Sequence, residues 1–119
     1  MLRVLARTIA AGAFASTLFA CGSASTDPTP VTGAVTATAD LTFTPSSVTV
    51  TRQSGTTQVT WTFESVTHNV HWDTQPSGGA VENISNTSGM SVARDFTVAG
   101  TYTYHCGIHP SMTGTVVVQ

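Results

Sequence analysis

Residues 104–112 read Tyr104-His105-Cys106-Gly107-Ile108-His109-Pro110-Ser111-Met112. This segment places a thiol, an imidazole and a thioether at the spacing Cys-x2-His-x2-Met. Pro110 biases His109 toward an extended backbone, and glycine permits tight turns on either side of that histidine. A second imidazole lies upstream, in the segment Val66-Thr67-His68-Asn69-Val70. All four side chains are metal-ligand types, so we predict that folding gathers them around one ion.

The ligand types favour copper over other metals. Cysteine and methionine sulfur suit Cu(I), and a His2Cys set with a weak axial Met is the ligand set of blue-copper electron-transfer centres. Zinc is a weaker candidate, because structural zinc sites prefer cysteine and histidine to a thioether. We therefore predict one type 1 copper ion, held by His68, Cys106, His109 and Met112.

Four segments resemble the cupredoxins, most closely the plastocyanin and amicyanin branch. They are Phe43-Thr44-Pro45, Val59-Thr60-Trp61, Thr67-His68-Asn69-Val70, and Gly100-Thr101-Tyr102-Thr103-Tyr104-His105-Cys106 running into the ligand loop. The likeness covers about residues 35–119. It implies a Greek-key β-sandwich of about eight strands. It also implies that Asn69 holds the ligand loop by hydrogen bonds and that His109 presents its ring edge at an apolar surface.

The residue pattern independently predicts an all-β fold. Period-two alternation appears in Val48-Thr49-Val50-Thr51 and in Val59-Thr60-Trp61-Thr62-Phe63, and turn residues recur at short intervals, which indicates a β-sandwich without a convincing helix. We expect strands at 35–42, 47–52, 57–63, 69–73, 81–84, 92–97, 101–105 and 114–118. The inward-facing candidates are Phe43, Val50, Val59, Trp61, Val70, Phe96, Tyr102, Val116 and Val118.

The first residues are typical of an export leader. Arg3 and Arg7 precede an apolar stretch that ends at Ala20-Cys21, so we predict a signal peptide over 1–21 with a lipobox-like Cys21. The alternative is an ordinary secretory signal cut near Ala20. Residues 22–34 are small, polar and proline-containing, which predicts a flexible linker before a domain at 35–119. The expected location is the periplasmic or extracellular face, anchored through lipidated Cys21.

Cysteine usage and charge narrow the function further. Cys106 would be the only thiol of the exported domain, and an unpaired exported thiol beside histidine and methionine favours metal binding. No lysine occurs, and removing the leader leaves two arginines against six acidic residues. Nucleic-acid binding is therefore disfavoured, because the basic surface that contacts phosphates is missing. His71 and His105 are interpreted as surface histidines, with alternation turning His105 away from the side to which Cys106 points.

We predict a monomeric electron shuttle, not an enzyme, that passes single electrons between a redox donor and a redox acceptor in the cell envelope. The alternative is an envelope protein that binds or delivers copper. An enzymatic role such as nitrite reduction needs an open metal position and a second copper. Met112 opposes the first requirement, and a chain with four histidines opposes the second.

Overall fold

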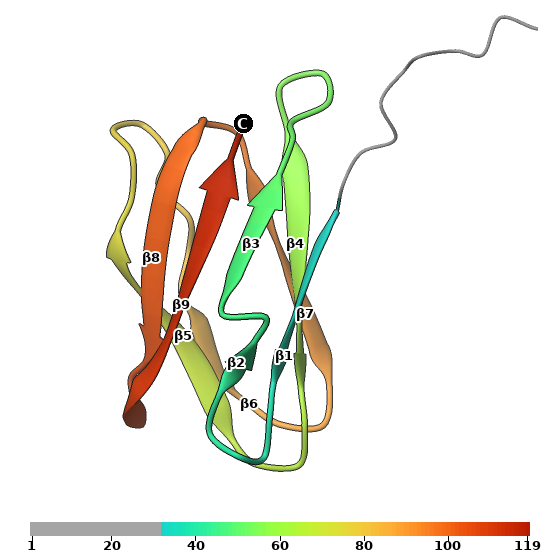
Figure 1. Ribbon diagram of the computed structural model, residues 1–119, viewed down its shortest axis with the longest axis vertical. Coiled ribbons are helices and arrows are strands. Elements are labelled where there is room, and N and C mark those ends of the chain that lie inside the picture. The colour runs from blue at the N-terminus through green and yellow to red at the C-terminus, as the bar shows by residue number, and fades with distance from the viewer. Residues whose placement is uncertain (1–31) are drawn as a thin grey trace, which may run out of the picture.

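The computed structural model describes residues 32–119, which form two β-sheets packed face to face (Figure 1). The first sheet contains, in spatial order, β2 (Phe43–Thr44), β1 (Gly33–Ala37), β4 (Thr57–Phe63) and β7 (Ser91–Phe96). The second contains β3 (Ser47–Val50), β9 (His109–Val118), β8 (Gly100–Cys106), β5 (His68–Thr74) and β6 (Ile84–Thr87). The predicted β-sandwich is confirmed, with nine strands in the described residues.

Most strand pairs are antiparallel, but β1 pairs with β4 and β3 pairs with β9 in parallel. The hairpin turn between β8 and β9 and the connection from β4 to β5 lie at the same, lower end of the sandwich (Figure 1). That end therefore receives the last residue of β8 and the first residues of β5 and β9. Within the described residues no helix is long and apolar enough to span a membrane.

Several predicted strand boundaries were wrong, each for a local reason. The first strand ends at Ala37 instead of residue 42, because a turn follows it. Leu41 has a φ of 60°, and its backbone N–H donates a hydrogen bond to the carbonyl of Thr38. The strand predicted at 81–84 lies at Ile84–Thr87. The residues before it are held in a loop, where Asn83 accepts a hydrogen bond from the backbone of Trp72.

The two ends of the domain also differ from expectation. β1 begins at Gly33, two residues before the predicted boundary, and pairs there with Val59. The last strand begins at His109 instead of residue 114. The predicted signal peptide and Cys21, with residues 22–31 of the predicted linker, lie outside the described residues.

The core lies between the two sheets and confirms every inward-facing residue predicted above. Each of those nine side chains is at most 3% exposed. Alternation along β4 gives the burial pattern directly, with Thr57, Val59, Trp61 and Phe63 buried and the residues between them more exposed. The buried residues that were not predicted include Val35, Ala37, Phe63, Ile84, Tyr104, Cys106 and Met112.

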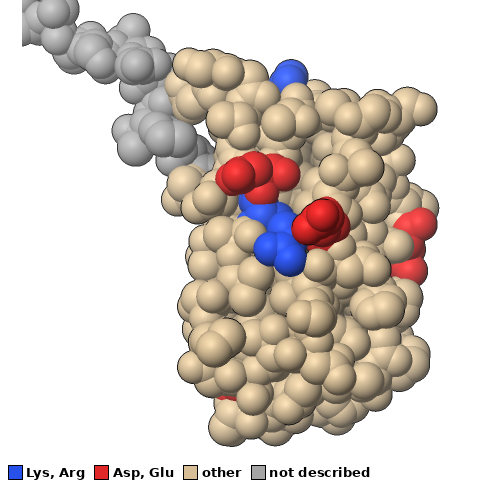
Figure 2. All heavy atoms as spheres, turned by 180° about the vertical axis from the view of Figure 1, so that it is seen from behind, with Lys and Arg blue, Asp and Glu red and all other residues tan. Residues whose placement is uncertain are grey.

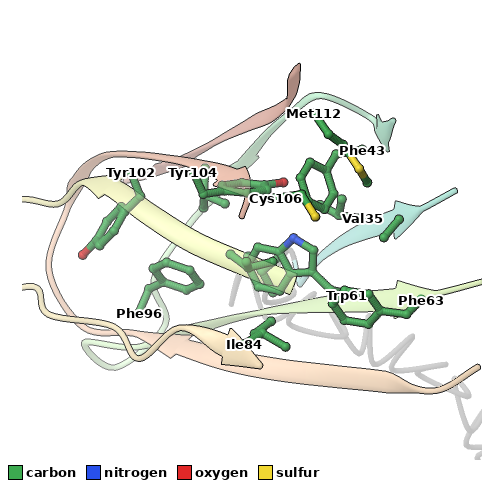
Figure 3. Close-up of a cluster of buried hydrophobic side chains, with 14 of the residues drawn as sticks. Val35, Phe43, Trp61, Phe63, Ile84, Phe96, Tyr102, Tyr104, Cys106 and Met112 are labelled. Atoms are coloured by element: carbon green, nitrogen blue, oxygen red, sulfur yellow. The ribbon is translucent and has the colours of Figure 1, made fainter. Parts of the chain in front are cut away.

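Aromatic rings fill much of this core (Figure 3). Tyr104 is central, with ring centroids 4.8 Å from Phe43, 5.6 Å from Trp61 and 5.3 Å from Trp72, all in edge-to-face arrangements. Tyr104 also explains Gly114, since a Cβ at that position would overlap the tyrosine ring. The missing side chain of Gly114 thus makes room for the Tyr104 ring against β9, whereas the sequence suggested that this glycine permits a turn.

Charged side chains are distributed unevenly over the surface. On the face seen in Figure 2 they gather in the upper half, whereas the lower part is almost free of charge, with one small acidic spot near its edge. Among residues 32–119, the large hydrophobic side chains that are exposed are Leu41, Met90 and Ile108, at 41%, 61% and 44%. Ile108 lies in the turn between β8 and β9, at the lower end.

Candidate metal centre

Three neighbouring strands bring the predicted ligands together. His68 is the first residue of β5, Cys106 is the last residue of β8, and His109 is the first residue of β9. Because β9, β8 and β5 are adjacent in the second sheet, these three strand ends meet at one end of the sandwich. The predicted ligand loop is in fact a tight hairpin, in which Cys106 pairs with His109 across the turn.

The three donor atoms lie close enough to bind a common ion. Nδ1 of His68 and Nδ1 of His109 are 3.2 Å apart, and the Cys106 Sγ lies 4.0 Å from the first and 3.7 Å from the second. Metal bonds of about 2.0–2.1 Å to nitrogen and about 2.3 Å to sulfur separate their donors by roughly 3.5–4 Å in a trigonal set. The spacing therefore fits one metal ion without moving a strand.

The orientation of His68 is fixed from its far side. Its Nε2 lies 2.9 Å from the carbonyl oxygen of Thr38, which can only accept, so Nε2 carries the proton. In the neutral ring Nδ1 then presents a lone pair toward Nδ1 of His109. Two such nitrogens at 3.2 Å need a proton or a metal ion between them. Cys106 and His68 are both fully buried, whereas His109 is half-buried.

The cysteine sulfur is prepared for metal binding in two ways. Cys106 is a free thiol in the described structure, and the backbone N–H of Asn69 points at its Sγ over 3.5 Å. A thiolate accepts such a bond more strongly than a thiol, and coordination itself supplies the drive for deprotonation. The Asn69 N–H therefore holds the sulfur on the side of the strand where the two histidine nitrogens lie.

Asn69 links the two halves of the site, as the resemblance implied. Its Oδ1 accepts a hydrogen bond of 2.5 Å from the backbone N–H of Gly107, next to Cys106. Its Nδ2 donates to Oδ1 of Asn86 over 2.9 Å, which fixes the amide orientation. Asn86 and the Thr38 carbonyl were missed by sequence reasoning. A backbone carbonyl carries no residue-type signal, and Asn86 resembled an ordinary loop residue.

Met112, predicted as the fourth donor, lies in the part of the core that also contains Cys106 and Phe43 (Figure 3). Its side chain is 2% exposed and also lines a small cleft of about 210 Å³ that includes Leu41 and Phe43. Met112 is therefore a buried core residue, and its role as an axial donor stays a prediction.

The remaining histidines lie on the opposite face of the second sheet. His105 is half-buried there, and its Nδ1 lies 2.7 Å from Oδ1 of Asp73, while His71 is exposed. Neither belongs to the group formed by His68, Cys106 and His109. Alternation along β8 thus separates His105 from Cys106, as predicted from the sequence.

A two-sheet β-sandwich with a buried cysteine and two histidines at one end defines a small copper protein of the cupredoxin class. The family described as copper binding proteins, plastocyanin/azurin family, matches residues 31–119, and the chain belongs to this family. Copper, predicted from the ligand types, is therefore the metal of this site.

Amicyanins are among the proteins that this chain is similar to. Amicyanin of Paracoccus denitrificans is 41% identical over 63 residues, which cover 51% of this chain and 48% of that protein. The chain thus matches about half the length of this curated relative. Among solved structures, the reduced Cu(I) form at pH 4 of a proline-to-glycine amicyanin variant has a TM-score of 0.61 and 30% identity, covering 76% of this chain and 92% of its own. A reduced tryptophan-to-tyrosine amicyanin variant also gives a TM-score of 0.61, with 31% identity, covering 74% and 82%.

Proposed function

We propose that this protein is a blue copper electron carrier whose ion is held by His68, Cys106 and His109, with Met112 as a weak axial donor. The observation that carries the proposal is the convergence of one sulfur and two imidazole nitrogens, all within 4.8 Å of one another, from three adjacent strand ends. Copper bound there would take up and release one electron by alternating between Cu(II) and Cu(I).

The protein's part is to keep the donors in place during that change. His68 is tied to Thr38, and Asn69 ties the start of β5 to the turn after Cys106. Both bonds are made by the protein alone and do not depend on the charge of the ion. A frame that holds its ligands in one geometry keeps the reorganisation between the two oxidation states small, which favours rapid electron exchange.

His109 is the proposed entry and exit point for electrons. It is half-buried, whereas His68 and Cys106 are fully buried, so its ring is the ligand nearest to solvent. Exposed Ile108 precedes it, and the lower end of the face in Figure 2 is nearly uncharged. An apolar rim of this kind allows a redox partner to approach without desolvating charges.

We further propose that the protein works in the cell envelope, as a monomer between a redox donor and a redox acceptor. The support is its leader-like first residues and a domain whose one cysteine is unpaired in the described structure. Cys21 would carry the lipid that anchors the chain to a membrane. The electron-carrier role requires no bound substrate and no general acid or base, so no enzymatic activity is proposed.

The test is an optical and EPR spectrum of the purified protein after addition of Cu(II). We expect an intense thiolate-to-copper absorption band, reversible one-electron redox behaviour and one copper per chain in the blue, cysteine-bound form. Cys106→Ala should abolish the band, whereas the matched control His71→Ala, which changes an exposed histidine, should retain it. A colourless protein that binds only Cu(I) and hands it to an acceptor would instead favour copper delivery. A blue Cys106→Ala protein would refute the ligand assignment.

A further inference from the structure

The two histidines outside the copper site face each other on the outer surface of the second sheet. His71 of β5 and His105 of β8 are register partners on antiparallel strands, and their ring centroids are 5.9 Å apart. The rings of His68 and His109, whose Nδ1 atoms approach to 3.2 Å, have centroids 5.1 Å apart. The centroid distance between His71 and His105 is therefore less than 1 Å longer than that between His68 and His109, whose nitrogens already converge.

Asp73 prepares one member of this pair as a ligand. Its Oδ1 lies 2.7 Å from Nδ1 of His105, so the carboxylate accepts the Nδ1 proton and leaves the Nε2 lone pair of the neutral ring free. A carboxylate that orients an imidazole in this way also makes its free nitrogen a better metal donor. Asp73 lies two residues after His71, so all three side chains project from the same face of the sheet.

His71 is positioned but not otherwise engaged. Its side chain makes no hydrogen bond within residues 32–119, and a Cβ at Gly107 would lie 3.3 Å from its Nε2. The ring therefore leans along the surface toward the turn that follows His105. An exposed imidazole with both nitrogens unpaired, next to a second imidazole with one free nitrogen, is a ligand pair for a borderline divalent cation.

We propose that His71 and His105 form a second, surface metal site that binds one divalent ion such as Zn²⁺ or Cu²⁺, with Asp73 orienting His105 from behind. Two imidazole nitrogens bind the ion, and water completes its coordination. The site is open to solvent and separate from the buried donors, because alternation turns the two sets to opposite faces of β8. This proposal does not depend on electron transfer by the buried centre.

The test is a zinc titration of the full chain with Cu(I) bound, followed by NMR of the histidine rings and by calorimetry. Zn²⁺ and Cu(I) are both diamagnetic, so all four rings are observable. We expect one zinc to bind saturably and to shift the ring signals of His71 and His105. His71→Gln and His105→Gln should each weaken binding at least tenfold. Asp73→Asn should weaken it less, since the amide still accepts the Nδ1 proton.

The matched control is Asp95→Asn, which removes the same charge at a distance, where Asp95 accepts a hydrogen bond from Gln58. It should leave the zinc affinity unchanged. The proposal is overturned by the absence of saturable binding, or by glutamine variants that bind zinc as tightly as the unchanged protein. Zinc-induced shifts confined to the ring signals of His68 and His109 would also overturn the proposal. Failure of the chain to bind copper would bear on the buried centre alone, because the outer rings are read separately.

Discussion

The buried histidine of the site takes its orientation from an atom that no side chain supplies, the carbonyl oxygen of Thr38. The cysteine likewise depends on the backbone N–H of Asn69, and the turn that follows it depends on the side chain of Asn69. At the scale of single residues, the metal donors are therefore identified by their chemistry, whereas their alignment comes from two backbone groups, which any residue type could provide, and from one amide side chain.

Met112→Leu tests the axial position. Loss of the thioether removes electron donation that stabilises Cu(II), so the reduction potential should rise while copper stays bound. Voltammetry of the copper-loaded variant measures the change. Met90→Leu is the control, because Met90 is 61% exposed, and it should leave the potential unchanged. An unchanged potential in Met112→Leu would mean that this sulfur does not approach the metal.

A substitution of Asn86 tests whether a residue whose side chain hydrogen-bonds to Asn69, and to no metal donor, helps to position the site. Asn86→Ala removes the acceptor for Asn69 Nδ2 and frees that amide to rotate, which weakens its bond to Gly107. We expect a shifted reduction potential and faster copper loss to a chelator. Asn86→Asp keeps an acceptor oxygen at the same place and should retain copper at nearly the original rate. Equal rates in the alanine variant and the unchanged protein would show that Asn86 plays no part in positioning.

At the scale of elements, the β8–β9 hairpin determines the geometry of the site. It carries Cys106 and His109 on paired positions and continues into the core, where Tyr102 and Tyr104 alternate with outward residues. The two tyrosines differ in their hydroxyl groups. Tyr102 donates to the carbonyl of Val98 over 2.7 Å, whereas the buried Tyr104 hydroxyl has no hydrogen-bond partner of acceptable geometry within the described residues.

This difference predicts opposite outcomes for the same substitution. Tyr102→Phe should lower the free energy of unfolding by about 1 kcal/mol, because a buried hydrogen bond is lost and a carbonyl is left unpaired. Tyr104→Phe removes a buried polar atom that gains little in the folded state, so its free energy of unfolding should stay the same or rise. Urea unfolding at neutral pH measures both. A larger loss in Tyr104→Phe than in Tyr102→Phe would contradict the assigned contacts.

At the scale of the whole molecule, the metal site is continuous with the hydrophobic core. The donors come from three strands, and Cys106 and Met112 are buried beside the aromatic cluster, so the site forms only when the sandwich is complete. An ion that binds the folded chain and not the unfolded chain stabilises the fold by mass action. The same burial affects the ionisation of the tyrosine at the centre of the cluster.

Burial raises the pKa of Tyr104 from 10.0 to about 12, against a smaller opposing effect of the Trp61 indole. The folded protein therefore keeps this proton at pH values where the unfolded chain has lost it. The contribution of the Tyr104 hydroxyl to the free energy of unfolding is complete below pH 10.0. Between pH 10.0 and about 12 this contribution falls, by about 1.4 kcal/mol per pH unit. Unfolding free energies measured across this range should fall less steeply for Tyr104→Phe. Identical slopes would mean that Tyr104 ionises equally in both states.

The sequence by itself determined the fold class and the ligand chemistry. Alternating residues such as those of β4 can bury one face only by pairing two sheets, so Val59 and Trp61 identify the core without coordinates. A thiol, two imidazoles and a thioether prefer the same metal wherever they meet. These properties follow from residue type and local period.

Tertiary structure alone decided where the strands end and which groups align the donors. β9 begins at His109 because Cys106 pairs with it across a tight turn, and β1 ends early because the turn at Leu41 closes there. Thr38, Asn86 and the facing pair His71 and His105 acquire their roles from strands that are distant in the chain and adjacent in the sheets. Hydrogen bonds and ring contacts of this kind depend on distances between strands, and local sequence patterns do not encode those distances.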